Sequence, residues 1–487
     1  MQFNSIQFII FFIFVIVFYF ILSHKYRWIL LLFSSYYFYM CWKPEYIFLI
    51  LFSTIVDYYC GLKMEGAQNR TYKKLFLTLS LFTNLSVLFA FKYLNFFSDS
   101  IRYILNEFNI FYNIPYFNVL LPVGISFYTF QTLSYTIDVY RGQKKAEKHL
   151  GVFALYVSFF PQLVAGPIER STRLLPQLKK ENSFDYLRFK NGLLLMLWGF
   201  FKKIVIADRL AVLVNTVYNN PIDYQGITLI IATIFFAFQI YCDFSAYSDI
   251  AIGASKIMGY DLMKNFNRPY FSKSIAEFWR RWHISLGSWF RDYLYFFLGG
   301  NKKGQLIWYK NLMLVFLISG LWHGANWTFV IWGFLHGFYM IFSIVVKNIK
   351  KYIFRVLNIN EKMYLVKFLK VFITFILVDF AWIFFRSNSL NDAIYIVENL
   401  FIFNINVLYD KSLHNLGLDE KDLYLSILLI LFLIIVQIKQ KNIDIIDYIN
   451  TKPFYIRWSF YFIGIFSIIT FGYYGQGNES QFIYFQF

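Results

Sequence analysis

Long apolar runs recur along the whole chain and constrain its fold more than any other feature. A helix that crosses the hydrocarbon core of a membrane needs about 20 mainly apolar residues. Charged residues make up only 15% of the 487 residues, against about 25% in soluble domains. We therefore expect an all-α polytopic membrane protein with about 11 transmembrane helices. The expected spans are 5–23, 28–42, 45–62, 75–97, 118–138, 191–213, 227–254, 326–346, 365–385, 423–437 and 457–473.

Two shorter apolar pieces, at 150–165 and 311–322, are better read as re-entrant half-helices. The second ends at His323, which lies between glycines and tryptophans in SGLWHGANW. About 11 residues at ~1.5 Å each cover roughly 16 Å, half of a hydrocarbon core ~30 Å thick. We therefore expect His323 near the middle of the membrane. An ionisable residue at that depth, on a broken helix, indicates a functional site.

Basic residues gather in alternate loops. The links at 25–27, 63–74 and 141–148 carry an excess of lysine and arginine, whereas those at 42–45 and 98–117 do not. The positive-inside rule then places the basic loops in the cytoplasm and both termini on the far side of the membrane. The same rule explains the formal charge of +18, so we expect no nucleic-acid partner. Because neither an internal repeat nor a long linker is visible, residues 1–487 are expected to form a single integral membrane domain.

The sequence predicts no metal site. Cys41, Cys60 and Cys242 are far apart and form no CxxC pair or Cys/His pair at zinc spacing. Three of the six histidines lie between 283 and 336, but no carboxylate stands at helical spacing from them. Buried small side chains are the simpler interpretation of the cysteines.

An amphipathic helix is expected near 275–290, with Ser274 as its N-cap. Glu277 is spaced to pair with Arg280 or Arg281 one turn later. Two interpretations of this helix remain open. Its tryptophans and arginines could lie among lipid headgroups, or the helix could dip inward.

In the second interpretation the helix brings His283 towards His323. A neutral imidazole in an apolar cavity has a lowered pKa and can act as a general base, for example on an alcohol that attacks a thioester. Asn326 or the N–H of Trp327 could then stabilise the developing oxyanion. For His336 we favour a packing role, as a hydrogen-bond partner between helices.

Polar groups also lie inside or beside other apolar runs. Asp243 and Asp249 fall within an expected span, where a carboxylate usually faces a cavity or a partner. Pro161, Gly166 and Pro167 break the chain after the first half-helix. That break fits either a simple re-entrant turn or an opening for a charged cytoplasmic donor.

Several ordered motifs resemble the membrane-bound O-acyltransferase family, and specifically its alginate O-acetyltransferase-like bacterial branch. The resemblance extends from about residue 120 to the end of the chain. The motifs are PQLVAGPIER (161–170), YCDFSAYSDIAIG (241–253), FNRPYFSKSIAEFWRRWHISLGSWFRDYLY (266–295), SGLWHGANWTFVIWGFLHG (319–337), WIFFR (382–386) and FIYFQF (482–487).

This resemblance implies a multi-helix membrane fold with re-entrant half-helices around a central funnel or tunnel. It implies an O-acetyltransferase that uses acetyl-CoA as its donor and needs no metal. His323, in the WHG motif, would be catalytic, and His283 would be the family's second characteristic histidine. The remaining candidates for the tunnel or donor site are Trp322, Asn326, Arg280, Arg281, Trp282, Asp243 and Pro167.

The resemblance also implies a place and an acceptor. The protein is expected in a bacterial inner membrane, among lipids, with both termini in the periplasm. It would move acetyl from cytoplasmic acetyl-CoA towards a cell-envelope polysaccharide. Peptidoglycan is favoured as the glycan acceptor, with alginate or another exopolysaccharide as the alternative. Because the largest external link is only about 386–421, a periplasmic O-acetyltransferase partner would complete delivery. A glycan or acyl transporter without catalysis is the competing class, since broken helices are typical of transporters.

Overall fold

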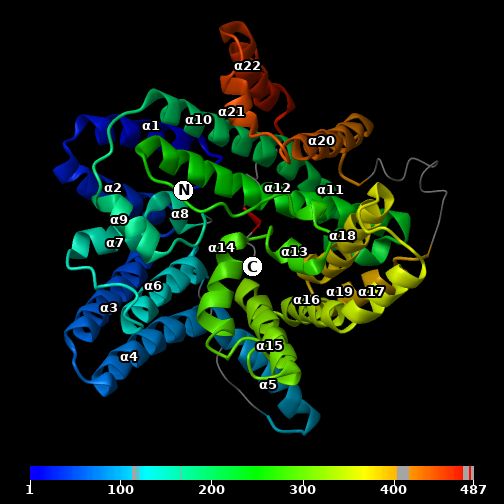
Figure 1. The fold of residues 1–487 in the computed structure, drawn as a ribbon, viewed down its shortest axis with the longest axis horizontal. Coiled ribbons are helices and arrows are strands. Elements are labelled where there is room, and N and C mark those ends of the chain that lie inside the picture. Colours follow the sequence, from blue (N-terminus) through cyan, green and yellow to red (C-terminus); the bar gives the residue numbers. More distant parts are fainter. Residues whose placement is uncertain (112–116, 118–119, 165, 403–415, 475–481, 484–487) are drawn as a thin grey trace. The chain divides into compact units, whose positions relative to one another are not determined.

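The described part of the chain is built from helices, with no strand among its residues (Figure 1). The computed structural model describes residues 1–487 except 112–116, 118–119, 165, 403–415, 475–481 and 484–487. The chain divides into two compact units. Unit 1 comprises Met1–Met196 and Ile250–Met263, and unit 2 comprises Leu197–Asp249 and Lys264–Phe487. The prediction of a single domain over 1–487 stays a prediction.

Unit 1 contains the first helices of the chain and the end of α12. They are α1 (Ile6–Ile21), α2 (His24–Met40), η1 (Pro44–Tyr46), α3 (Ile47–Gly66), α4 (Arg70–Leu88), η2 (Phe89–Tyr93), α5 (Leu94–Glu107), α6 (Ile125–Tyr140), α7 (Leu150–Ser158), α8 (Phe160–Leu163), α9 (Ser171–Lys179) and most of α10 (Tyr186–Phe200).

Unit 2 contains the rest, including most of the 32-residue helix α12. Its elements are η3 (Phe201–Ala207), α11 (Asp208–Asn219), η4 (Pro221–Asp223), α12 (Ile227–Met258), η5 (Pro269–Phe271), α13 (Ile275–Trp279), α14 (Ile284–Trp289), η6 (Phe290–Tyr295), α15 (Gln305–His323), α16 (Trp327–Val345), α17 (Lys347–Val356), α18 (Tyr364–Arg386), α19 (Leu390–Asn399), α20 (Glu420–Lys439), α21 (Ile445–Asn450) and α22 (Phe454–Phe471).

In unit 1, α3, α4 and α6 pack around a polar centre. Asp57 on α3 is fully buried, and its carboxylate accepts hydrogen bonds from Ser80 Oγ (2.6 Å) and Asn84 Nδ2 (2.9 Å) on α4. Thr132 of α6 donates to Asn84 Oδ1 at 3.3 Å. A carboxylate at this depth is tolerated because protein donors surround it.

In unit 2, α15 and α16 lie side by side (Figure 1) and touch through backbone at two glycines. A Cβ on Gly320 would stand 2.2 Å from the carbonyl oxygen of Phe329, and one on Gly333 would stand 2.4 Å from that of Phe316. No side chain fits at either position. Small residues allow membrane helices to approach this closely, and here the close approach holds the end of α15 against α16.

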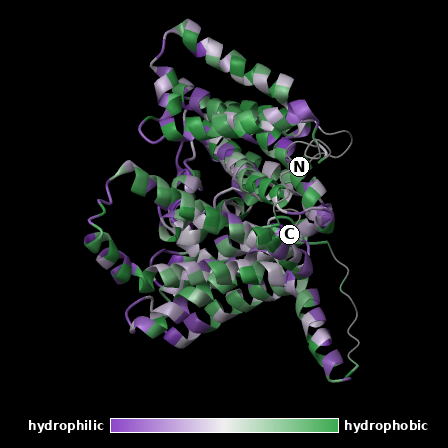
Figure 2. Cartoon of the chain, turned by 90° about the vertical axis from the view of Figure 1, so that its right-hand side faces the viewer, coloured by the Kyte–Doolittle hydropathy of each residue, from purple (hydrophilic) through white to green (hydrophobic). Residues whose placement is uncertain are grey.

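Eight of the described helical segments are long and apolar enough to cross a membrane, judged by length and composition. They are Pro44–Gly66, Arg70–Glu107, Ile227–Met258, Gln305–His323, Trp327–Val345, Tyr364–Arg386, Glu420–Lys439 and Phe454–Phe471. Figure 2 shows apolar residues along the helices and many hydrophilic ones in the loops. The all-α membrane class is therefore confirmed, and seven of the expected spans fall on these segments.

The other expectations have mixed outcomes. The stretches 5–23, 28–42 and 191–213 and the described part of 118–138 are mostly helical but lie outside this set of eight. In its described residues the 150–165 piece forms two short helices, α7 and α8, and its re-entrant course stays a prediction. The central funnel or tunnel stays a prediction.

The half-helix predicted at 311–322 is wrong. Helix α15 begins at Gln305 and is 19 residues long, because polar residues before the apolar run continue the same helix. His323 therefore ends a helix of full spanning length. The estimate that placed it at mid-membrane, which depended on a half-length helix, no longer holds.

Candidate active site

Two histidines from distant parts of unit 2 meet in its interior. His323 is the last residue of α15, and His283 stands between α13 and α14. Their ring centroids are 6.5 Å apart, with 62° between the ring planes. Both side chains are buried, at 3% and 0% exposure. The position of His283 therefore agrees with the interpretation in which the 275–290 segment dips inward, and the headgroup interpretation is wrong for His283.

The continuous helix predicted over 275–290 is also wrong, because the chain breaks it immediately before His283. Helix α13 is capped as predicted, with Ser274 Oγ accepting the N–H of Glu277, but it ends at Trp279. His283 then adopts a left-handed backbone conformation, with φ 42° and ψ 56°, before α14 begins. Such a conformation costs about 1–3 kcal/mol in a residue with a side chain and is frequent at functional sites. It immediately precedes α14, and the imidazole of His283 is buried there.

Asn265 determines which nitrogen of His283 carries the proton. Its Oδ1 accepts from the backbone N–H of Ser285 (3.3 Å) and from Ser285 Oγ (2.9 Å), so this atom is an acceptor. His283 Nδ1 lies 3.1 Å from the same oxygen and must therefore be the protonated nitrogen. Asn265 Nδ2 donates to Ser248 Oγ at 3.2 Å, which fixes the amide. The lone pair of the ring is consequently on Nε2, the nitrogen that a general base uses.

Aromatic rings surround both histidines. His323 contacts Trp322 and Trp332, each with ring centroids 5.0 Å away, and Phe385 at 5.4 Å. Phe244 of α12 packs edge-on against His283 at 4.7 Å. These walls exclude bulk water from the pair. Electrostatic interactions are stronger in such a site than in water.

Burial has a direct effect on the protonation of His283. It lowers the pKa of this imidazole from its ordinary value to about 3, because the charged form is desolvated. His283 is therefore neutral throughout the physiological pH range.

His336 behaves as the packing residue that the sequence favours. It is fully buried on α16, and its Nδ1 accepts the indole N–H of Trp279 at 3.3 Å. Its ring also lies 4.9 Å from that of Trp332. This contact joins α13 to α16 and so supports the segment that carries His283.

The tryptophans among the other predicted site residues lie close to the pair. Trp322 precedes His323, and its ring is 6.0 Å from that of His283. Trp282 is buried and packs 5.0 Å from Trp382 of α18.

The charged and polar candidates are engaged elsewhere. Arg281 pairs with Glu277 at 2.6 Å, as its spacing predicts, while Arg280 is exposed. Asn326 caps α16 by accepting the N–H of Thr328, and its Nδ2 donates to the carbonyl of Asn388. Its amide is thus used to hold the helix start. Pro167 is buried, but it belongs to unit 1.

Asp243 has a cationic partner that the sequence analysis missed. Lys203 is 1% exposed and forms ion pairs of 2.8 Å with both Asp243 and Asp208. Lys202 beside it pairs with Asp249 at 2.7 Å. Adjacent lysines inside an otherwise apolar stretch were the available signal, because a buried charge requires a partner. Both lysines belong to η3, whose wider π-helical turn breaks the regular α-helical register.

The terminal motif FIYFQF is described only at Phe482 and Ile483. The Ile483 N–H donates to Asp243 Oδ2 at 2.8 Å, and Phe482 stacks on Tyr247 at 4.1 Å. Phe482 also lies 5.9 Å from Phe244, the residue that packs on His283. The rest of the motif lies outside the described residues.

No three histidine, cysteine or acidic side chains of the described residues stand close enough together to hold a metal ion. The two central histidines share their surroundings with indole, phenyl and amide groups. Such a site supports proton transfer by imidazole.

Comparison with known proteins agrees with this geometry. The sequence profile described as MBOAT, membrane-bound O-acyltransferase family, matches residues 78–385. The probable alginate O-acetylase AlgI of Pseudomonas aeruginosa is 40% identical over 419 residues, covering 85% of this chain and 77% of that protein. The peptidoglycan O-acetyltransferase of Helicobacter pylori is 36% identical over 402 residues, 77% of this chain and 73% of that protein. The teichoic acid D-alanyltransferase of Bacillus subtilis is 31% identical over 262 residues, 49% of this chain and 63% of its own. The matched residues include both histidines together with Trp322, Trp332 and Phe385.

Proposed function

This chain belongs to the membrane-bound O-acyltransferase family, and on that premise we propose that it transfers an acetyl group to a polysaccharide hydroxyl at a buried histidine pair. The observation that carries the proposal is the meeting of His283 and His323, with ring centroids 6.5 Å apart, inside an aromatic enclosure. Asn265 supports it by holding the His283 ring in the tautomer whose Nε2 bears the lone pair.

In the proposed reaction, the acceptor hydroxyl attacks the carbonyl carbon of the acetyl thioester while His323 takes the hydroxyl proton. His283 Nε2 accepts a hydrogen bond from a neighbouring hydroxyl of the sugar and so orients the acceptor. As the intermediate collapses, the C–S bond breaks, and the leaving thiolate recovers the proton from the His323 imidazolium. One ester and one thiol result. Proton transfer by a positioned imidazole contributes about 10²- to 10⁴-fold to such reactions.

We propose acetyl-CoA as the donor, supplied from the cytoplasm. The arrangement of basic loops supports this orientation, with both termini in the periplasm of a bacterial inner membrane. A periplasmic O-acetyltransferase partner would receive the acetyl group or deliver it to the sugar. The short external links of the chain support a separate partner.

The acceptor is proposed as a cell-envelope or secreted polysaccharide. Relatives named as alginate O-acetylases and a relative named as a peptidoglycan O-acetyltransferase match similar shares of this chain, at 40% and 36% identity. Peptidoglycan, the acceptor favoured by the sequence analysis, and alginate therefore both remain to be separated by experiment. Radiolabelled acetyl-CoA supplied to the cytoplasmic face of membrane vesicles, with each glycan and the partner on the other face, would do so.

The proposal predicts that His323→Ala abolishes acetyl transfer. Purified protein should release CoA from acetyl-CoA in the presence of acceptor, and the variant should lose about 10²-fold or more of this rate. His24→Ala, which removes a half-buried histidine near the N-terminus whose Nε2 lies 3.1 Å from the carbonyl oxygen of Lys179, is the matched control and should keep full activity. An unchanged melting temperature would show that the variant is folded. Undiminished turnover by folded His323→Ala would disprove the assignment.

A further inference from the structure

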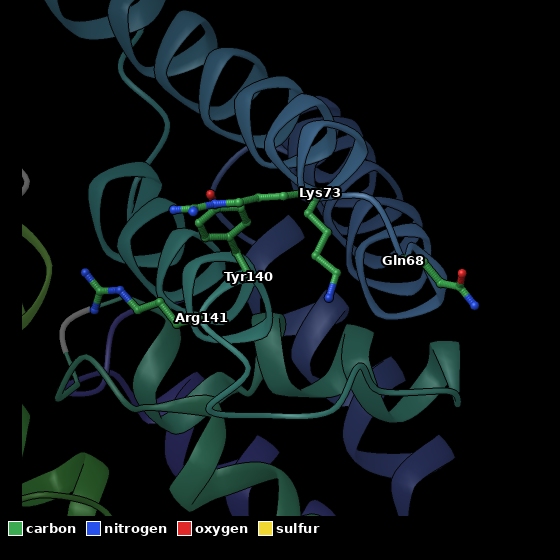
Figure 3. Close-up of a pocket in the computed structure, with 5 residues that line it drawn as sticks. Gln68, Lys73, Tyr140 and Arg141 are labelled. Carbon is green, nitrogen blue, oxygen red and sulfur yellow. The ribbon is translucent and has the colours of Figure 1, made fainter.

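A pocket of about 370 Å³ opens beside α3, α4 and α6 in unit 1, and basic side chains dominate its lining (Figure 3). In this view Lys73 and Tyr140 lie near the centre, with Gln68 and Arg141 on either side. No carboxylate is among the lining residues, which are Gln68, Arg70, Lys73, Tyr140 and Arg141. The acyltransferase chemistry proposed above uses none of them.

The fold brings these cations together from two separate loops. Helix α3 ends at Gly66 and α4 begins at Arg70, so Arg70 and Lys73 occupy the first turn of α4. Arg141 follows directly after the last residue of α6. The two loops, 63–74 and 141–148, are those that the positive-inside rule assigns to the same side of the membrane. Their meeting at one pocket agrees with that assignment.

The positions of Arg70 and Lys73 are electrostatically unfavourable within the described part of the chain. Arg70 and Lys73 are three residues apart on one helix, where like charges repel. They also stand at a helix N-terminus, where the backbone dipole presents positive charge. Neither forms an ion pair with a carboxylate in the described part of the chain. A bound anion would offset all three effects.

The chemistry of the lining selects among anions. Arginine presents a planar set of donors that matches phosphate oxygens, and lysine adds a compact positive charge. A volume of about 370 Å³ lies within the range of small-molecule sites, roughly 300–1,000 Å³, and exceeds what a bare phosphate ion needs.

We propose that this pocket binds the phosphate group of an organic phosphate. Two sources share that chemistry. An anionic phospholipid could place its headgroup here, since α3 and α4 are both parts of candidate membrane spans that end at the pocket. A soluble nucleotide with phosphate groups could reach the same site from the aqueous side.

The proposal can be tested on the full-length protein purified in detergent. The probes are phosphatidylglycerol, with zwitterionic phosphatidylcholine as the comparison without net charge, and adenosine 3′,5′-bisphosphate. Binding is measured by native mass spectrometry and by the shift in melting temperature. The test variant combines Arg70→Gln, Lys73→Gln and Arg141→Gln. The control combines Lys347→Gln, Lys350→Gln and Lys351→Gln on α17, which removes the same charge from exposed positions.

We expect saturable binding of one probe, weakened at least about tenfold in the pocket variant and unchanged in the control. The probe that binds identifies the source of the phosphate. Without ligand, the pocket variant should melt at the same or a higher temperature, because the repulsion between cations is relieved. Arg141→Gln alone, at an exposed position after α6, serves as a milder second variant. Equal binding by wild type and pocket variants, or no saturable binding of either probe, would overturn the proposal.

Discussion

Asn265 is a positioning residue for His283, and its role can be separated from a purely structural one. Asn265→Ala removes the acceptor of the His283 Nδ1–H and frees the ring to change tautomer or rotate. We expect kcat to fall by about 100-fold, because misplacement of a catalytic group has effects of that size. KM should change little. An unchanged kcat in folded Asn265→Ala would disprove the positioning role of Asn265.

In the conservative variant Asn265→Asp, the pH dependence of activity distinguishes a positioning role from a purely structural one, because a structural role would leave it unchanged. A carboxylate keeps the acceptor, so activity should be largely restored relative to Asn265→Ala. It also favours the imidazolium, so the pKa of His283, which burial holds at about 3, should rise. The acid limb of the profile of kcat/KM against pH should therefore move to higher pH. A profile identical to that of wild type would contradict this account.

Single residues differ in how well the sequence revealed them. His323 was recognisable because glycines and an apolar run surround it. For His283 the sequence left two interpretations open, because the left-handed turn that directs it inward depends on its contact with Asn265, 18 positions away. Lys202 and Lys203 were missed, although Asp243 and Asp249 were identified as needing partners. Pairing between two apolar segments is a tertiary property that no local pattern contains.

At the level of elements, the close contact between α15 and α16 should not tolerate a side chain at Gly333. Gly333→Ala would place a Cβ about 2.4 Å from the carbonyl oxygen of Phe316, so the helices must separate. Overpacking of this kind typically costs about 1–3 kcal/mol. We expect a lower melting temperature and weaker acetyl transfer, since α15 ends at His323.

Gly66→Ala is the matched control for that substitution. Gly66 ends α3, and a Cβ there meets nothing within 4 Å. The exchange should be neutral or slightly stabilising, since alanine is the better helix former. If both variants melt like wild type, the close contact does not contribute to stability.

The two errors in predicted elements have related physical causes. The apolar run at 311–322 predicts a separate element, but backbone hydrogen bonding extends α15 back to Gln305 through Lys310. Conversely, the amphipathic pattern at 275–290 predicts one helix, but Asn265 and the turn at His283 divide it. Hydropathy reports where apolar side chains are, whereas helix ends are set by capping and by distant contacts.

For the molecule as a whole, the buried carboxyl of Glu169 should make the free energy of unfolding depend on pH. This carboxyl is buried, accepts the N–H of Met263 and has Arg173 Nε 4.0 Å away. Burial, opposed by that hydrogen bond and by Arg173, raises its pKa from 4.5 to about 7. Because the folded-state value is the higher one, its stabilising contribution is complete below 4.5 and is lost as the pH rises through about 7.

The Glu169 contribution should therefore lower the melting temperature between about pH 4.5 and about pH 7, and Glu169→Gln should lack this decrease. His283 has the opposite sign. Its lowered pKa gives stability that is present above the ordinary value of 6.5 and is lost as the pH falls towards about 3. The two ranges overlap between 4.5 and 6.5 with opposite signs, so the difference between the melting curves of wild type and Glu169→Gln isolates the Glu169 effect. Identical slopes for wild type and Glu169→Gln between about pH 4.5 and about pH 7 would contradict the assignment to Glu169.

The fold class of the whole molecule was predictable from the recurring apolar runs alone, because only helices and closed barrels satisfy their backbone in lipid. How the helices pack was not. The buried Asp57 cluster, the histidine pair and the basic pocket each join segments that are far apart in sequence. Motif resemblance supplied the chemistry, and tertiary contacts supplied its setting.

The order in which the site residues occur along the chain has a consequence for biosynthesis. Phe244, Asn265, His283 and His323 precede Phe385, which completes the enclosure of His323. A nascent chain shorter than about 385 residues thus carries both histidines without their full aromatic wall. The enclosure is complete only when most of the polypeptide has entered the membrane. An unfinished chain therefore lacks the complete site for reaction with a thioester.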